Sequence, residues 1–587
     1  MIFSSSNLAE ENNVFLQEEL DSALRAAVSH GIKIPHINIE VFAEKQSAFQ
    51  LPGRFAEFCD EIRQSERFRI ERQRNTVRCI GGAYPGVLRA FYGVLRNSLG
   101  IRWYGLSEKD VYFTRNNVPY REEGVPKIPF RGIECCLDEF NTPALLDKFF
   151  RWMARSSWNM LMFNADKLEK NKEAREFIGK MAPKCGIEVV EGEHVMETLL
   201  PPELIREHPE YFGLYGNGRR ISGKVQIPEH KKRYKVHIQP CLSNPDCRRH
   251  IATNVANYIE RHPNIKIYAL WPHDGINNWC RCKNCRSKAP YAMMHELASE
   301  VLSKVSRPVY IQLIAYANLL NVPSGKVSQE ARIHTLFCPY MRNYKHHFYE
   351  PGFPESKLRL GTAYPGNEHV YPQDDREYGI LLKRWLAFLK KIDSDFGVFS
   401  YYQLAFRDER GLDDRSRYMR QTNPIFLQEE IRELSKNGIK VFIDCSWPFP
   451  GLWPDANLNA VYGDILWDPE SNIIPGLKEF YSSLNGLDKI ICEISEKLDL
   501  GVRSFNDCDL PAKLKTARKG TLEYRIKLWV EYVKKASLAR TLKLEGKGNE
   551  AAEHEKAIIE LVRHNQDYLK DYTSVDWLVK LATWGNT

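Results

Sequence analysis

Apolar residues in the middle of the chain follow two alternating spacings. Short continuous apolar runs, typical of strands that are buried on both faces, recur eight times between residues 131 and 445. The segments between them carry apolar residues at helical spacing. Eight strands alternating with helices predict an α/β fold, a (β/α)8 TIM-like barrel. The eight runs are Arg131–Leu137, Asn159–Phe163, Ile187–Val190, Ile265–Leu270, Val309–Tyr316, Ile333–Phe337, Gly397–Tyr402 and Ile439–Cys445.

The pattern changes on both sides of this region. Before it, strand-like runs at Phe68–Ile70 and Val77–Ile80 and a helical pattern over Val87–Leu99 predict a small α/β domain. The proline-rich stretch Val118–Pro129 is the best candidate linker. After Ser446 only helix-periodic segments follow. We therefore predict three domains: a small α/β domain over 1–128, the barrel over 129–450 and a helical domain over 451–587.

Composition narrows the function classes. The 83 basic and 75 acidic residues leave a net charge of +8, which is small for 587 residues. The electrostatic field around the protein is therefore weak, and this argues against a nucleic-acid partner. No stretch approaches the ~20 apolar residues of a membrane span. The N-terminus lacks the pattern of a signal peptide, so we expect a cytoplasmic protein unless a leader was removed. The 14 cysteines are irregularly spaced, as expected of reduced thiols. The sequence does not indicate an oligomeric state.

The segment Trp271–Arg286, WPHDGINNWCRCKNCR, is the strongest candidate for a site. It directly follows the fourth strand-like run, and barrels build their chemistry at the carboxyl ends of their strands. Asp274 is the first candidate for a catalytic carboxylate, although Asp followed by Gly is also a common turn pair. His273 and the aromatic Trp271 and Trp279 lie beside it in sequence.

Other acids lie on or after predicted strands. They are Glu134 and Asp138 on the first, Asp408 and Glu409 after the seventh, and Asp444 on the eighth. A buried carboxylate needs a reason, which is either a site or an ion pair with an arginine such as Arg131 or Arg407. Aromatic residues at strand ends, which could line a pocket for sugar rings or simply belong to the core, are Tyr316, Tyr401, Tyr402, Trp447 and Trp453.

Three cysteines, Cys280, Cys282 and Cys285, have the spacing of metal ligands. Structural zinc takes four ligands, so a fourth must come from elsewhere, and His273, His295, Cys241 and Cys338 are candidates. The alternative is a thiol-rich loop without metal. No cofactor is expected for catalysis. The sequence contains no GxSxG, Walker A, GxGxxG or HExxH motif, which argues against the commonest hydrolase, nucleotide-binding and metalloprotease classes.

Several segments resemble the bacterial proteins grouped as domain of unknown function 4838, which are related to glycoside hydrolase family 163 and more distantly to families 20 and 67. The resemblance implies a small α/β domain, a catalytic barrel and a helical domain that act on glycans. The family 20 pair of adjacent Asp and Glu is replaced here by Asp274 and Gly275. The segments that carry it are FYGVLRNSLGIRWYG (91–105), HPEYFGLYGNGRR (208–220), PCLSNPD (240–246), HDGINNWCRCKNC (273–285), LIAYANLLNVP (313–323) and LNAVYGDILWDP (458–469), the last also similar to α-glucuronidases.

The leading hypothesis is a glycoside hydrolase that uses Asp274 and Glu134 as its catalytic carboxyl groups. The resemblance implies an endo-β-N-acetylglucosaminidase acting on N-glycan-like substrates. One alternative is an α-glucuronidase-like exo-hydrolase, in which Arg219, Arg220 or Arg342 binds a sugar carboxylate. The other is a glycan-binding barrel without catalysis. The residues expected to contact the glycan are Trp271, His273, Trp279, Tyr316, Tyr402, Asp444 and Trp447.

Overall fold

The fold was obtained as a computed structural model. It describes the 587-residue chain except for residues 6, 46–50, 115–120, 136–141, 217, 227–234, 341, 343, 345, 355–371, 373, 403–422, 446–458, 484–486, 488, 491–511, 573–574, 577 and 580–587.

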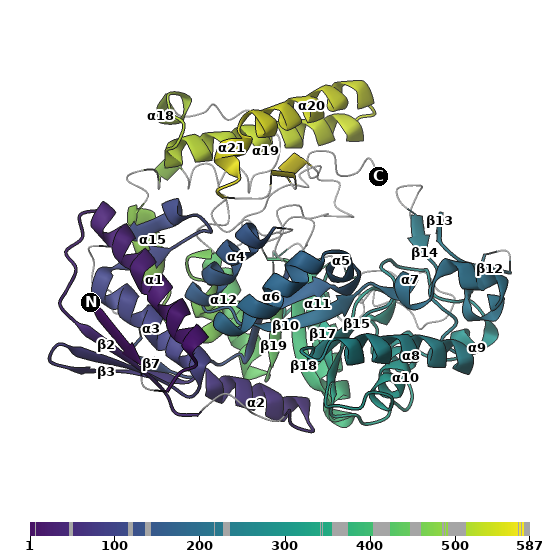
Figure 1. Cartoon of the computed structure of the whole chain (residues 1–587). Helices are drawn as coiled ribbons and strands as arrows, with labels where there is room; N and C mark the ends of the chain where they lie inside the picture. Colours follow the sequence, from purple (N-terminus) through teal and green to yellow (C-terminus); the bar gives the residue numbers. More distant parts are fainter. Residues whose placement is uncertain are drawn as a thin grey trace.

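Eight parallel strands close into a barrel, so the predicted fold class is confirmed (Figure 1). Each strand coincides with one of the eight apolar runs, because a barrel strand is buried on both faces and reads as continuously apolar. In barrel order they are β8 (Phe130–Cys135), β9 (Met160–Asn164), β10 (Glu188–Glu193), β15 (Ile267–Leu270), β16 (Tyr310–Ala315), β17 (Ile333–Phe337), β18 (Asp395–Ser400) and β19 (Val441–Asp444).

Helices cover the outside of the barrel, and local sequence explains where several of them begin. The side chains of Thr142, Asn171, Asn244, Asp374 and Asn423 cap backbone N–H groups in the first turns of five helices. The main helices are α4 (Pro143–Arg155), α6 (Lys172–Lys184), α8 (Pro245–Arg261), α10 (Pro290–Leu302), α11 (Asp375–Lys391) and α12 (Pro424–Lys436); α5 (Ala165–Lys170) is shorter.

The N-terminal part forms a five-stranded sheet in the order β1-β2-β4-β3-β7. Helix α3 (Tyr84–Leu99) packs on this sheet, and α1 (Glu10–Ser29) packs against α3. The expected strands at 68–70 and 77–80 and the helix over 87–99 are all present and somewhat longer. The strands are β1 (Ile2–Ser5), β2 (Asn38–Ala43), β3 (Phe68–Gln73), β4 (Thr76–Gly81) and β7 (Glu123–Gly124), and a hairpin of β5 (Ile101–Trp103) and β6 (Val111–Phe113) follows α3.

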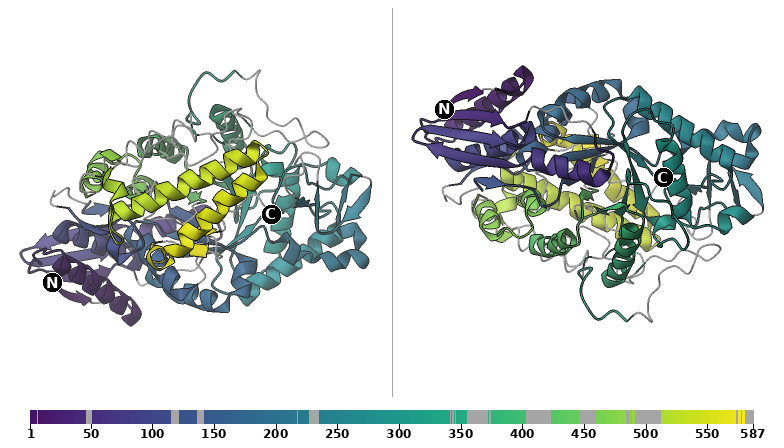
Figure 2. Two further views of the ribbon diagram at one scale, coloured as in Figure 1. Left: turned by 90° about the horizontal axis from the view of Figure 1, so that it is seen from above. Right: turned by 90° about the horizontal axis from the view of Figure 1, so that it is seen from below.

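Helix α2 (Phe55–Ser65) covers the amino end of the barrel. Phe55 stacks on His334 with ring centroids 3.8 Å apart, and Phe58 stacks on Tyr310 at 5.0 Å. Both histidine and tyrosine lie at the starts of their strands. Figure 2 shows α2 over this end when the molecule is seen from below. The carboxyl ends of the strands therefore open on the opposite side.

A buried ion-pair network joins the N-terminal part to the barrel. Glu66, directly after α2, accepts hydrogen bonds from Arg131 of β8 at 2.6 and 2.7 Å and from Arg89 of α3 at 2.9 and 3.1 Å. The guanidinium of Arg131 lies over the ring of Trp467, 5.0 Å from its centroid. Trp467 ends α14 (Tyr462–Trp467), so the ILWDP motif has a packing role.

The C-terminal part of the described chain is helical, as expected. Helices α19 (Leu522–Leu544) and α20 (Gly548–His564) form a hairpin with its own apolar cluster. Figures 1 and 2 place this hairpin across the barrel from α2, on the side of the carboxyl strand ends. No helix in the described ranges has both the length and the apolar character to cross a membrane. The shorter helices here are α15 (Ile474–Ser483), α18 (Ala512–Lys515) and α21 (Gln566–Leu569).

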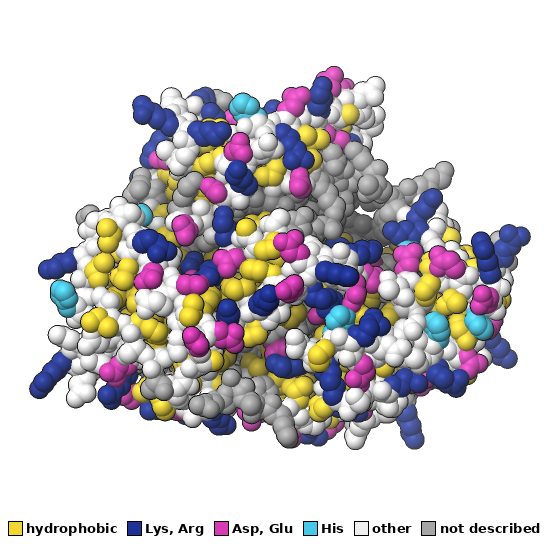
Figure 3. Space-filling view, in the orientation of Figure 1, with side chains coloured by type: hydrophobic (Ala, Val, Ile, Leu, Met, Phe, Trp, Pro, Cys, Tyr) yellow, Lys and Arg dark blue, Asp and Glu magenta, His cyan; other side chains and the backbone are white. Residues whose placement is uncertain are grey.

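The visible surface carries both signs of charge. On the face shown in Figure 3, lysine and arginine side chains are interspersed with aspartate and glutamate. This distribution agrees with the weak net field expected from the composition.

Candidate active site

Aromatic side chains gather at the carboxyl ends of the barrel strands, a region we call the mouth. Trp271 follows β15, Tyr316 follows β16, Tyr340 follows β17 and Tyr401 follows β18. Tyr340 lies edge-on to both Tyr316 and Tyr401, with centroids 5.6 and 5.3 Å apart. These residues belong to the apolar cluster that fills the barrel interior. Sequence reasoning named Trp271, Tyr316 and Tyr401 but missed Tyr340.

Asp274 lies at this mouth with an exposed side chain. Its carboxylate accepts a hydrogen bond of 3.0 Å from the Tyr316 hydroxyl. The ring of His194, directly after β10, lies 5.3 Å from Trp271 and 6.2 Å from Tyr316. The structure therefore brings together Asp274, Trp271 and Tyr316, all three of which the sequence had proposed for one pocket.

Buried amide side chains hold the Asp274 loop from two sides. Asn278 donates to the carbonyl oxygens of Asp274 at 3.1 Å and His237 at 2.8 Å. Asn318, after β16, donates to the Asn278 side chain at 2.6 Å and to the Gly275 carbonyl at 3.1 Å. Such bonds fix the position of the loop backbone, and with it the position of the carboxylate.

Two further carboxyl groups, Glu134 and Glu193, lie near each other at the mouth. Glu134 is the last residue but one of β8 and accepts a hydrogen bond of 3.1 Å from the Cys445 thiol. Glu193 ends β10, is only 9% exposed, and receives one long hydrogen bond of 3.4 Å from Asn164. Within the described residues its other oxygen, Oε1, has no hydrogen-bond partner. Burial raises the pKa of Glu193 well above its ordinary value, and the nearby charge of Glu134 raises it further.

The backbone of β10 is irregular where it presents Glu193. Glu191, two residues earlier, points outward to Arg175 and Tyr258 on the covering helices. Regular alternation would send Glu193 the same way. Instead φ is +137° at Gly192 and +75° at Glu193. A Cβ at position 192 would meet the Ala269 carbonyl oxygen at 2.1 Å, so only glycine fits. A non-glycine residue at positive φ is strained, and such strain is concentrated at functional sites.

His273 stacks on another histidine, and Trp279 is buried in the main core. The His273 ring stacks on His237 at 4.7 Å, and burial, followed by the nearby His237, lowers the pKa of His273 to about 3. Trp279 is 2% exposed and packs in the main core beside Cys280 and Cys285. The contact of these two residues with a substrate stays a prediction.

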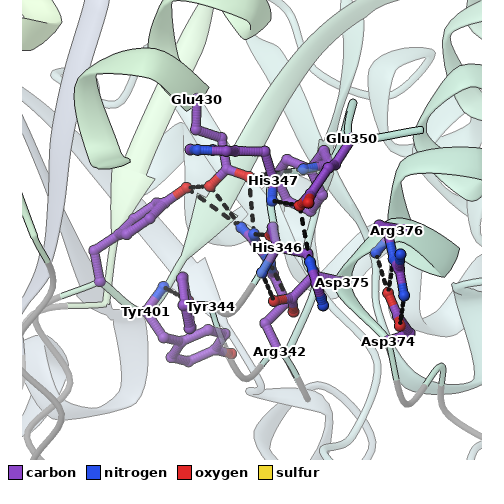
Figure 4. Close-up of polar contacts among 12 residues, drawn as sticks. Arg342, Tyr344, His346, His347, Glu350, Asp374, Asp375, Arg376, Tyr401 and Glu430 are labelled. Atoms are coloured by element: carbon purple, nitrogen blue, oxygen red, sulfur yellow. Dashed lines mark hydrogen bonds and ion pairs between the residues drawn. The ribbon is translucent and has the colours of Figure 1, made fainter. Parts of the chain in front are cut away.

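Tyr402 and Asp444 take part in buried networks outside the barrel interior. The Tyr402 hydroxyl donates a hydrogen bond to Glu430. Glu430 also pairs with Arg342 at 2.7 and 2.8 Å, as Figure 4 shows. Asp444 accepts hydrogen bonds from the Ser400 hydroxyl at 2.8 Å and the Tyr402 N–H at 2.9 Å. These bonds explain the burial of both residues without a substrate, so we leave them out of the proposed site.

Several sequence candidates lie outside the described residues. They are Asp138, Asp408, Glu409, Trp447 and Trp453.

The family model described as domain of unknown function DUF4838 matches residues 121–358. This confirms the predicted resemblance. The matched stretch contains Glu134, Glu193, Asp274 and Tyr316. No curated protein matches the chain.

The chain is similar to several solved structures. A family 138 glycoside hydrolase that targets pectin rhamnogalacturonan II has a TM-score of 0.51 at 11% identity, covering 99% of this chain and 92% of its own. A β-N-acetylhexosaminidase from Bacteroides fragilis has a TM-score of 0.42 at 10% identity, covering 84% and 91%. A family 20 exo-β-N-acetylglucosaminidase from Vibrio harveyi has 0.41 at 11%, covering 84% and 74%. The first of these likenesses supports the barrel architecture.

The DUF4838 stretch also brings four cysteines together. Cys280, Cys282 and Cys285 are joined by Cys241, which was one of the candidates for a fourth ligand. All four sulfur atoms lie within 4.8 Å of one another. The other candidates, His273, His295 and Cys338, are not in this group. The cluster has the donors that a metal ion would need.

Proposed function

We propose that the protein is a glycoside hydrolase with its active site at the barrel mouth. The observation that carries the proposal is the convergence of three carboxyl groups, Glu134, Glu193 and Asp274, at the carboxyl ends of β8, β10 and β15. Hydrolysis of a glycosidic bond uses a pair of carboxyl groups, one protonated and one ionised. The neighbouring aromatic side chains suit the apolar faces of sugar rings.

Glu193 is the better proton donor of the three. Asp274, the first candidate from the sequence for a catalytic carboxylate, is exposed and accepts a hydrogen bond from Tyr316. Glu193 is buried, and the raised pKa keeps its proton available for the leaving oxygen. Negative charge on Glu134 helps to keep that proton in place.

Asp274 then acts on the other side of the scissile bond. As an ionised carboxylate it would activate a water molecule, attack the anomeric carbon or stabilise the positive charge that develops there. Glu134, whose charge acts on Glu193, would help to stabilise this positive charge. In this proposal Asp274 and Glu134 stay in the catalytic set, and Glu193 is added as the proton donor.

For the substrate we propose a glycan containing N-acetylglucosamine, cleaved by an endo mechanism as the family resemblance implies. The α-glucuronidase-like alternative loses one of its proposed carboxylate ligands, because Arg342 is fully buried and paired with Glu430 and Asp375. Arg220 is also engaged, since it donates to the Phe212 carbonyl oxygen at 2.7 Å.

For the four cysteines we propose a structural zinc ion rather than a catalytic one. Their side chains pack in or against the main core, whereas Trp271 and Tyr316 belong to the cluster at the mouth. A catalytic zinc keeps one position open for water or substrate, and four thiolates leave none.

The test is a panel of N-glycans, aryl glycosides and pectin fragments, digested and read by mass spectrometry. We expect cleavage by the parent protein and a loss of at least about 10²-fold in turnover for Asp274→Asn, the usual lower limit for losing acid–base catalysis. Asp246→Asn, at an exposed position on α8, is the matched control and should retain full activity. Near-full activity of Asp274→Asn would exclude this residue from catalysis. Binding of a glycan without cleavage would favour the non-catalytic barrel.

A further inference from the structure

The four cysteine sulfurs have the spacing of a tetrahedral metal site. Cys241 Sγ lies 3.6 Å from Cys282 Sγ and 3.9 Å from Cys285 Sγ. Four sulfurs at the usual 2.3 Å from a zinc ion would be about 3.8 Å apart. A disulfide would need a separation of about 2.0 Å. The geometry therefore favours a shared metal over a sulfur–sulfur bond.

The surroundings of the sulfurs suit thiolates. The Leu214 N–H donates to Cys280 Sγ at 3.3 Å, and the Cys285 N–H donates to Cys282 Sγ at 3.4 Å. The guanidinium of Arg220 lies 4.0 Å from Cys280 Sγ. Four thiolates around a divalent ion leave two negative charges in excess, and N–H donors with a neighbouring arginine are the groups that offset them.

The cluster joins two segments that are far apart in sequence. Cys241 follows β14 (Lys235–His237) in the insert after β10, which also contains β11 (Gly213–Tyr215), β12 (Arg219–Ile221) and β13 (Lys224–Gln226). The other three cysteines follow the Asp274 loop, and Cys285 lies in the short helix α9 (Lys283–Arg286). A metal here would cross-link the insert to the loop that carries Asp274.

The cross-link lies directly beside the bonds that position Asp274. Gln239 donates from its backbone N–H to the Asn278 carbonyl oxygen at 2.8 Å and from its side chain to the His273 carbonyl oxygen at 2.7 Å. Cys241 lies two residues beyond Gln239, and Cys280 lies two residues beyond Asn278. Fixing the two cysteines together therefore limits separation of the segments at Gln239 and Asn278.

We propose that Cys241, Cys280, Cys282 and Cys285 bind one zinc ion, which cross-links the insert to the Asp274 loop and holds that loop at the mouth. The metal-binding part stands on the cysteine geometry alone. The effect on turnover rests on the proposed function. The zinc ion is a positioning element and does not touch the substrate.

Metal analysis of the purified full-length protein tests the binding. We expect about one equivalent of zinc, and less than about a tenth of an equivalent in Cys241→Ser, because three remaining thiolates no longer complete the site. Cys79→Ser, at a buried cysteine in the N-terminal sheet, is the matched control and should keep its zinc. If Cys241→Ser does not fold, the parent protein decides: metal-free protein with four freely reactive thiols at these positions would overturn the proposal.

Hydrogen exchange followed by mass spectrometry tests the positioning role without a substrate. Removal of the metal with a chelator should speed exchange in residues 236–242 and 271–282, while the N-terminal sheet keeps its protection. Zinc-bound protein whose loop exchanges equally fast after metal removal would overturn the positioning role. If metal and protection behave as expected but no glycan is cleaved, the proposed function fails and the zinc site stands.

Discussion

At the scale of single residues, the surroundings of Glu193 favour its proposed role as proton donor. Its side chain is buried, one carboxylate oxygen has no hydrogen-bond partner in the described structure, and a second carboxyl group lies nearby. Each of these conditions favours the neutral form. The strained backbone at Gly192 and Glu193 aims the group at the mouth rather than at the covering helices. A raised pKa favours the protonated form, which is the form that a proton donor requires.

Replacing this residue should change both the rate and its pH dependence. Glu193→Gln keeps the shape but carries no transferable proton, so we expect kcat to fall by about 10²–10⁴-fold on substrates with poor leaving groups. The parent rate should decline as pH rises through the pKa of Glu193, and the variant should lose this decline. Steady-state kinetics at a series of pH values would measure this decline. If the variant keeps the same decline at high pH, another group donates the proton.

The same residue leaves a mark on stability. Because the folded pKa lies above the ordinary 4.5, the folded state holds a proton that the unfolded state releases. Its contribution to stability is present below pH 4.5 and is lost as pH rises through the folded pKa, at about 1.4 kcal/mol per pKa unit. Glu193→Gln should therefore gain stability relative to the parent as pH rises. Urea unfolding at several pH values measures the free energy of unfolding of both proteins. If Glu193 titrated normally, the difference between the two free energies would not change with pH.

At the scale of elements, α2 has a role that its sequence position does not suggest. It precedes most of the N-terminal sheet in the chain, yet its phenylalanines close the amino end of the barrel. Its helical pattern marks one apolar face but not the surface that this face covers. The eight barrel strands were predictable for the opposite reason, since burial on both faces leaves a continuous apolar run.

Phe55→Ala should therefore destabilise the barrel. The side chain is fully buried against Phe130, Tyr310 and His334. Truncation of such a phenylalanine costs about 3–5 kcal/mol. Phe42→Ala, at a phenylalanine of β2 that is 43% exposed, is the control and should cost much less. Chemical unfolding of the two variants would measure the difference, and equal losses would contradict the closing role of α2.

Continuous apolar runs also explain what the sequence could not predict about the site. When both faces of a strand are apolar, the pattern does not tell which residues point into the barrel. Asp444 and Tyr402 were candidates for this reason, and the structure gives them buried partners on the outer side. Glu193 was missed because its direction depends on two positive φ values. Asp274 was found because an acid beside aromatic residues directly followed a strong strand signal.

At the scale of the whole molecule, contacts between segments that are distant in sequence determine the role of individual motifs. The three closely spaced cysteines indicated a metal site but not its fourth ligand, which lies 41 residues before Cys282. The ILWDP motif contributed to the resemblance to a catalytic family, but in the structure it has a packing role. Its Trp467 lies against Arg131, the arginine that joins the N-terminal part to the barrel. Both contacts link distant segments, and sequence spacing carries no information about such pairs.

The central claim is that the carboxyl groups at the mouth hydrolyse a glycosidic bond. Digestion of the glycan panel in H₂¹⁸O, read by mass spectrometry, tests it most directly. The account predicts that the parent protein releases fragments carrying one ¹⁸O at the new reducing end, and that Asp274→Asn and Glu193→Gln release them at least about 10²-fold more slowly. Glycans that stay intact, or fragments without ¹⁸O, would contradict the claim. So would labelled fragments that both variants release as fast as the parent protein does.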